Sequence, residues 1–276
     1  MNKMGFGFLR IPKKDDHTYD YDKLNKMVDM YMEKGGYYFD TCYTYLNGKS
    51  EEAIRRCVVE RKERSSYMLA NKLPGYMFKS YDDCQKYYEE ELRRCGVDYF
   101  DVLMLHWLND KHYEIAQKYH EFDFLVDKKS KGEVKYIGFS FHGDALLLDQ
   151  ILTEHSEVDI VLLQINYLDW NSEGIQSKKC YDVCVKHNKK VYVMEPVKGG
   201  TLAKLPKQAS DLLKSYHPLW SETRWALAFV QSLPQVEICL SGMNEVIHIE
   251  ENMQDIDPLT DKEIDILIST TVIEVG

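Results

Sequence analysis

The sequence predicts an α/β fold, a single-domain (β/α)8 TIM barrel over residues 1–276, and three observations favour it. Eight short runs rich in β-branched and aromatic residues alternate with eight amphipathic helical patterns. Two of these runs, 102–105 and 160–163, are continuously apolar, as expected of strands buried on both faces. Gly5 and Gly7 lack the third glycine of a dinucleotide-binding fingerprint, which disfavours an open doubly wound sheet.

The predicted elements follow one another in regular order, strands from short apolar runs and helices from apolar residues recurring every three or four positions. Strands are predicted at residues 4–9, 37–40, 67–73, 99–106, 134–140, 160–165, 190–195 and 236–240. Helices are predicted near 21–34, 50–62, 80–94, 112–131, 144–154, 173–188, 220–233 and 245–253. A C-terminal helix is expected after Pro258, because Thr260 and Glu263 have the spacing of a capping box.

The composition excludes several classes of function. The 35 basic and 45 acidic residues give a net charge of −10, which disfavours nucleic acid or an anionic membrane as a partner because both need a basic face. No apolar run is long enough for a membrane helix, and residues 1–14 lack the apolar stretch of a signal peptide. The seven cysteines are scattered, so we expect reduced thiols, no metal and a cytoplasmic location. Nothing in the pattern indicates an oligomeric state.

Polar side chains gather where three successive predicted strands end. Asp40 ends the second strand, Lys72 lies near the end of the third, and His106 ends the fourth. Tyr43 and Tyr45 follow Asp40 within five residues. Because the chemistry of a barrel lies at the carboxyl ends of its strands, and neighbouring strands are ~5 Å apart, we expect these groups to converge. A buried lysine keeps its charge only when paired, and Asp40 is the natural partner of Lys72.

These residues, in this order and spacing, resemble the aldo-keto reductase superfamily over residues 4–252. The matching segments are Asp40-Thr41-Cys42 with Tyr45 and Glu51, Asn71-Lys72-Leu73, Leu105-His106-Trp107, residues 132–140, Gln164 with Asn166, and Glu251-Asn252. The resemblance implies an NAD(P)H-dependent reductase that converts a small carbonyl substrate, an aldehyde or ketone, into an alcohol with NADP or NAD as cofactor. It also implies a catalytic tetrad of Asp40, Tyr45, Lys72 and His106, with Tyr45 as the general acid.

The residue types suit that reaction. Reduction by hydride leaves an alkoxide that must receive a proton, and the hydride itself comes from the cofactor. A phenol, with an ordinary pKa of ~10, gives up its proton more easily when the ammonium of Lys72 stabilises the phenolate. Asp40 keeps that lysine charged, and a neutral His106 can donate a hydrogen bond that positions the carbonyl oxygen.

The resemblance also implies a cofactor site built from loops that follow the strands. The residues implied to contact the cofactor are Phe8, Leu9, Ser140, Gln164, Met194, Pro196, Lys198, Gly199, Gly200, Ser241, Gly242, Met243, Asn244, Glu251 and Asn252. Ser140 and Gln164 would bind the nicotinamide carboxamide, and the paired glycines allow the backbone to approach the pyrophosphate closely. Tyr43 and Trp107 are expected to line the substrate pocket.

The chain departs from the family pattern at the cofactor site. Phe141 follows Ser140 where many members have Asn, and Met194 replaces the usual aromatic that stacks on the nicotinamide. The stretch 242–248 offers Gly242, Met243 and His248 but no Lys or Arg for an adenosine 2′-phosphate. The choice between NAD, NADP and both is therefore left open.

The segments 138–143 and 194–200 are similar to a bacterial subgroup whose members often continue into a cysteine-rich, ferredoxin-like extension. No cysteine follows Cys239, so that extension is absent from this sequence and no iron–sulfur cluster is assigned to it.

Two other functions stay open. A nicotinamide-binding redox-sensing or regulatory subunit with slow turnover would use the same cofactor site. A Schiff-base aldolase would use Lys72 as its nucleophile, since barrels host that chemistry. Asp40 argues against the aldolase, because the lysine of an aldolase must be neutral to attack.

Overall fold

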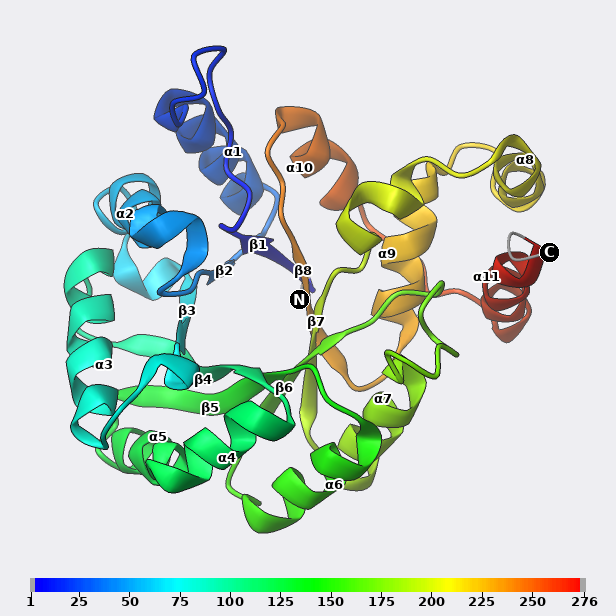
Figure 1. The fold of residues 1–276 in the computed structure, drawn as a ribbon. Helices are drawn as coiled ribbons and strands as arrows, with labels where there is room; N and C mark the ends of the chain where they lie inside the picture. Colours follow the sequence, from blue (N-terminus) through cyan, green and yellow to red (C-terminus); the bar gives the residue numbers. More distant parts are fainter. Residues whose placement is uncertain (1–2, 274–276) are drawn as a thin grey trace.

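The computed structural model describes residues 3–273, and its eight strands form a closed parallel barrel (Figure 1). The strands are β1 (Met4–Gly7), β2 (Tyr38–Asp40), β3 (Met68–Leu73), β4 (Phe100–Leu108), β5 (Val134–Phe141), β6 (Ile160–Gln164), β7 (Lys190–Met194) and β8 (Val236–Ser241). Each strand pairs with its neighbour in chain order, and β8 closes on β1 with Cys239 opposite Met4. The barrel predicted from the alternating pattern is confirmed.

Helices surround the strands in Figure 1. They are α1 (Tyr21–Glu33), α2 (Lys49–Ile54), α3 (Asp82–Cys95), α4 (Asp110–Lys118), α5 (Glu121–Ser130), α6 (Ala145–Glu154), α7 (Ser177–Lys186), α8 (Lys207–Tyr216), α9 (Glu222–Ser232), α10 (Val246–Asn252) and α11 (Asp261–Ile273). The capping box before α11 forms, because Thr260 N–H donates to Glu263 Oε2 at 2.8 Å and Glu263 N–H to Thr260 Oγ1 at 3.4 Å. Within residues 3–273, no helix is long and apolar enough to cross a membrane.

Two helical predictions are wrong in detail, and one helix was not predicted. The helix expected at 112–131 is two helices, α4 and α5, separated at His120, whose backbone has a φ of 54°. The helix expected at 50–62 is an α-helical turn followed by a π-helical segment, η2 (Arg55–Val59). Helix α8 lies between β7 and α9, where the simple alternation of strand and helix predicts only a loop.

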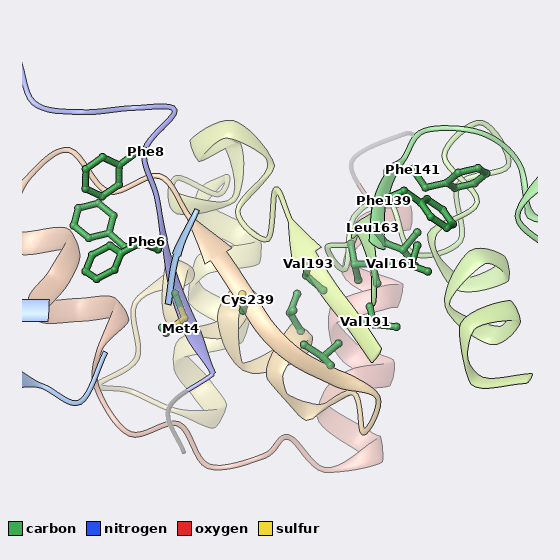
Figure 2. Close-up of a cluster of buried hydrophobic side chains, with 14 of the residues drawn as sticks. Met4, Phe6, Phe8, Phe139, Phe141, Val161, Leu163, Val191, Val193 and Cys239 are labelled. Atoms are coloured by element: carbon green, nitrogen blue, oxygen red, sulfur yellow. The ribbon is translucent and has the colours of Figure 1, made fainter. Parts of the chain in front are cut away.

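Alternate residues of each strand face opposite sides of the barrel wall. One set packs outward against the helices, and Figure 2 shows Val161 and Leu163 of β6 in this outer cluster. The other set fills the barrel. The rings of Tyr38 and Tyr192 meet edge-on at 5.3 Å although β2 and β7 are not neighbours in the sheet, so their contact crosses the interior. The inner cluster is Tyr38, Ala70, Val102, Met104, Ile160, Leu162, Tyr192, Ile238 and Leu240.

The inner row of side chains ends in polar residues. Asp40, Lys72 and His106 each lie two positions after a member of the inner cluster, on β2, β3 and β4. Because side chains of a strand repeat every second residue, all three face the interior at the carboxyl ends of their strands. The fold thereby places a carboxylate, an ammonium and an imidazole at the same mouth of the barrel.

Candidate active site

A groove of about 510 Å³ opens at the carboxyl ends of the strands, and it contains most of the predicted site. The predicted residues that line it are Leu9, Asp40, Tyr45, Lys72, His106, Ser140, Met194, Pro196, Gly199, Gly200, Ser241, Gly242, Asn244, Glu251 and Asn252. All four tetrad residues are therefore gathered at one end of a groove that continues along the loops after β7 and β8.

Asp40 and Lys72 form a buried ion pair at the floor of this groove. Lys72 Nζ lies 2.5 Å from Asp40 Oδ1 and donates to the carbonyl of Thr41 at 2.9 Å. The Lys72 side chain is 0% exposed. Burial alone lowers the pKa of Lys72, but the charge of Asp40 more than offsets it and the net shift is upward. Lys72 therefore keeps its proton, and a protonated lysine is not the nucleophile a Schiff-base aldolase needs.

Tyr45 lies directly over this charge. The Lys72 ammonium is 5.0 Å from the centroid of the Tyr45 ring. Burial raises the pKa of the Tyr45 phenol, and the positive charge of Lys72 opposes that shift. The two residues after Tyr45 carry positive φ angles, 53° at Leu46 and 55° at Asn47. Left-handed backbone at two consecutive non-glycine residues is costly, and such strain clusters at functional sites.

His106 is neutral and is held beside Tyr45. Burial and the nearby charge of Lys72 lower the pKa of His106 to about 3. Its ring meets the Tyr45 ring edge-on, with centroids 5.9 Å apart, and its Nδ1 lies 3.1 Å from Cys42 Sγ. The β4–β5 pairing shifts register just after Leu105, so His106 projects from an irregular end of its strand. Bulges of this kind redirect side chains next to active sites.

Several groove residues were not predicted as site residues, among them Arg10 and His142. Arg10, three residues after the end of β1, lines the groove, and its Nη1 donates to the carbonyl of Gly199 at 3.3 Å. His142, two residues after Ser140 near the end of β5, lines it as well. The rule that barrel chemistry follows the carboxyl ends of strands points to both positions, since each lies just after a strand.

Four predicted cofactor residues lie outside the groove lining. Phe8 and Met243 are 0% exposed and belong to the outer hydrophobic cluster. Gln164 and Lys198 instead bind the carboxylate of Asp169, with Gln164 Nε2 at 3.3 Å and Lys198 Nζ at 2.5 Å. Through Asp169, these contacts link the end of β6 and the loop after it to the loop after β7.

The two predicted substrate-pocket residues lie beside the groove rather than in its lining. The Tyr43 hydroxyl accepts a hydrogen bond from Arg94 Nη2 at 3.2 Å, and its ring meets Tyr87 edge-on. Trp107 is 45% exposed at the rim, and its ring contacts those of Tyr76 and His142. Tyr43 faces α3, which carries both Tyr87 and Arg94.

A comparison of the chain with known families finds a match over nearly its whole length. The sequence model of the aldo/keto reductase family matches residues 3–270. The chain belongs to this family. As an aldo/keto reductase it is an NAD(P)-dependent oxidoreductase.

Curated relatives of this aldo/keto reductase are distant in sequence but similar in length. An uncharacterized oxidoreductase of Bacillus subtilis (strain 168) is 24% identical over 284 residues, covering 91% of this chain and 88% of the relative. An uncharacterized oxidoreductase of Schizosaccharomyces pombe is 23% identical over 270 residues, covering 92% and 81% of the two chains.

Solved structures support the fold of the reductase. A thermostable aldo-keto reductase in complex with the inhibitor epalrestat superposes with a TM-score of 0.80 at 21% identity, covering 98% of this chain and 95% of the other. The holo form of an aldo-keto reductase from Bacillus halodurans gives 0.76 at 22% identity, covering 97% and 91%. An aldo-keto reductase from Klebsiella pneumoniae in complex with NADPH gives 0.75 at 15% identity, covering 98% and 90%.

Proposed function

We propose that this aldo/keto reductase reduces an aldehyde or ketone to the alcohol, with Tyr45 as the general acid and NADPH or NADH as the hydride source. The observation that carries the proposal is the convergence in one groove of a phenol, a charged lysine paired with a buried carboxylate, and a neutral imidazole. The nicotinamide cofactor supplies the hydride when bound.

The groove fits a dinucleotide. Gly199 and Gly200 have positive φ angles of 64° and 103°, and a Cβ added at Gly200 would meet no atom within 4 Å. This bare backbone leaves room for a pyrophosphate to approach. Farther along, Asn252 Nδ2 donates to Ser241 Oγ at 3.1 Å, which fixes two polar groups at the end of the groove that we assign to the adenosine. Ser140, near the tetrad, would hold the nicotinamide end.

Arg10 places a cation beside Gly199, in the part of the groove that we assign to the pyrophosphate. Its side chain is exposed, lies between Gly199 and Gly242, and is held by one hydrogen bond of 3.3 Å to a neutral carbonyl. A phosphate offers an arginine stronger, charge-assisted hydrogen bonds than a carbonyl does. We therefore assign Arg10 to the pyrophosphate of the cofactor.

The chain's own residues perform the acid half of the reaction. As negative charge develops on the carbonyl oxygen, the Tyr45 hydroxyl donates its proton there. The adjacent Lys72 ammonium stabilises the phenolate left behind, and Asp40 keeps that ammonium in place. His106 stays neutral at physiological pH, so one of its ring nitrogens can donate to the same oxygen and orient it.

The proposal is tested in two steps with purified protein. NADH and NADPH are first titrated against the protein by nicotinamide fluorescence, and oxidation of the bound form is then followed with a panel of aldehydes and ketones. We expect binding and turnover in the wild type. Tyr45→Phe should bind the cofactor as tightly and lose at least two orders of magnitude in kcat, since a positioned general acid contributes roughly 10²–10⁴ in rate. Tight binding without turnover on any carbonyl would instead identify a regulatory, nicotinamide-binding subunit.

The seven cysteines are all free and buried, which supports the prediction of a reducing, cytoplasmic environment for the protein.

A further inference from the structure

Cys42 is a buried thiol in direct contact with the ring of His106. Its side chain is 0% exposed, and its Sγ lies 3.1 Å from His106 Nδ1. The other polar atoms near this sulfur are farther away, with Thr44 Oγ1 at 3.5 Å and the carbonyl oxygen of Lys72 at 3.7 Å. Within residues 3–273 the His106 side chain makes no other hydrogen bond, so Cys42 is the hydrogen-bond partner of a ring that Tyr45 and Tyr76 pack against.

Which nitrogen of His106 carries the proton decides what the ring can do for a substrate. A neutral imidazole has one N–H donor and one bare nitrogen acceptor, and the hydrogen bond made by one nitrogen selects the state of the other. A carbonyl oxygen accepts hydrogen bonds and cannot donate one. His106 can therefore orient a carbonyl through Nε2 only if Nε2 bears the hydrogen and Nδ1 is bare.

The thiol of Cys42 is suited to act as the donor to a bare Nδ1. Burial raises the pKa of Cys42 to about 12, so the sulfur keeps its hydrogen at physiological pH. A thiolate in this place would have the opposite effect, because it would accept a hydrogen from Nδ1 and leave Nε2 without one. The contact to Nδ1 is also the shortest that the sulfur makes, which favours this acceptor over the Lys72 carbonyl.

We propose that Cys42 is a positioning residue for carbonyl reduction: its S–H donates to Nδ1 of His106 and holds the ring in the Nε2–H tautomer, with that hydrogen directed at the groove. The inference rests on the proposed function, because the value of an Nε2–H donor lies in orienting a carbonyl oxygen. No atom of Cys42 contacts the substrate in this scheme, and no covalent step involves the sulfur.

The tautomer is measured directly by ¹⁵N NMR of histidine-labelled protein, in which protonated and bare ring nitrogens resonate far apart. His106 is assigned by the signal lost in His106→Gln. We expect the wild type to show a protonated Nε2 and a bare Nδ1. Cys42→Ala should give a mixture of the two tautomers, whereas Cys42→Ser, which keeps an O–H donor, should restore the Nε2–H form. Cys57→Ala, at another 0%-exposed cysteine outside the groove lining, is the matched control and should leave the signal unchanged.

The kinetic counterpart uses the same variants. We expect Cys42→Ala to lower kcat for a carbonyl substrate by about tenfold, the effect of losing one positioning hydrogen bond. Its affinity for NADPH, measured by fluorescence, should be unchanged, and Cys42→Ser should recover most of the rate. A merely structural role for the thiol would not shift the tautomer while leaving cofactor binding intact.

The outcomes separate this inference from the proposed function. A wild-type spectrum with a protonated Nδ1, or a Cys42→Ala spectrum identical to that of the wild type, overturns the role of Cys42 even if carbonyl reduction is efficient. The wild-type spectrum suffices for this if the alanine variant does not fold. An Nε2–H tautomer that depends on Cys42, in a protein that reduces no carbonyl, supports the positioning contact and refutes the proposed function.

Discussion

Replacing Asp40 by asparagine is the sharpest test of how the buried ion pair supports the site. Lys72 is 0% exposed, and Asp40→Asn keeps an oxygen that can accept from Lys72 Nζ but removes the negative charge that pairs with the ammonium. Breaking a buried pair by removing one partner costs about 3–5 kcal/mol. A second estimate of this cost agrees. A buried, unpaired lysine can lose its proton instead of staying charged, and lowering an ordinary lysine pKa of ~10.4 to 7 corresponds to roughly 4–5 kcal/mol.

The expected result is a loss of about 3–5 kcal/mol in the free energy of unfolding at pH 7, measured by urea denaturation. The rate should fall as well, because a neutral Lys72 no longer stabilises the phenolate of Tyr45. The double variant Asp40→Asn with Lys72→Met removes the charge together with its partner, so we expect it to be more stable than Asp40→Asn alone.

A surface pair serves as the control. Lys178 and Asp182 lie 2.7 Å apart on α7 with 50% and 55% of their side chains exposed. Asp182→Asn should cost only a few tenths of a kcal/mol, since exposed pairs are screened by water. If Asp40→Asn costs no more than Asp182→Asn, or if the double variant shows purely additive losses, Lys72 is not held as a buried charge.

Three further predictions follow from other contacts. Tyr43→Phe should leave kcat and KM within about twofold of the wild type in steady-state assays, because the Tyr43 hydroxyl binds Arg94 rather than the groove. The wild type should prefer NADPH over NADH by less than about tenfold in Kd, because the stretch 242–248 offers no Lys or Arg to a 2′-phosphate. Arg10→Gln should weaken NADPH and NADH binding alike, since we assign Arg10 to the pyrophosphate that both cofactors carry. Burial raises the pKa of Glu121 to about 8, so the folded protein holds a proton that the unfolded chain loses at lower pH. Stability should therefore fall as pH rises from about 5 to about 8, by up to ~1.4 kcal/mol per unit, and Glu121→Gln should flatten this slope in urea titrations at several pH values.

Each of these predictions has an outcome that contradicts it. A large loss of kcat in Tyr43→Phe with full activity in Tyr45→Phe would show that the general acid is Tyr43 and not Tyr45. Unchanged NADPH affinity in Arg10→Gln would show that this side chain does not reach a phosphate. Parallel stability curves for Glu121→Gln and the wild type between pH 5 and pH 8 would mean that the Glu121 carboxyl is ionised in the folded protein.

The barrel was predictable because strands buried on both faces consist of continuous apolar residues, which are visible in the sequence. The break between α4 and α5 was not, because the chain turns at His120 with a φ of 54° and no glycine or proline marks the place. Helix α8 was not predicted for a different reason. It lies between β7 and α9, and a regular alternation of one strand with one helix has no second helix after β7.

The candidate site likewise has a part that the sequence predicts and a part that it does not. The placement of Asp40, Lys72 and His106 at one mouth of the barrel could be predicted, because a position at a strand end is visible in the sequence and determines which way the side chain faces. The contact of Cys42 with His106 joins residues 64 positions apart, and nothing local in the sequence encodes it. The position of Arg10 in the groove was not predicted, because a cation was sought only near β8, whereas barrel closure brings the loop after β1 beside Gly199 and Gly242.

Two separate sets of neighbouring strands, which we call the first and the second arc of the barrel, form the groove. The tetrad comes from β2 with the loop after it, β3 and β4, whereas the part assigned to the cofactor comes chiefly from the loops after β7 and β8. A change on the second arc should alter the turnover of every carbonyl compound by a common factor, because all of them share one hydride source. A change near Tyr76 or His142, which lie by His106 and by the rim of the mouth, should alter the ratio between compounds. In an assay with two competing carbonyl substrates the common factor cancels, so the ratio of the two alcohol products depends only on the part of the groove formed by β2, β3 and β4.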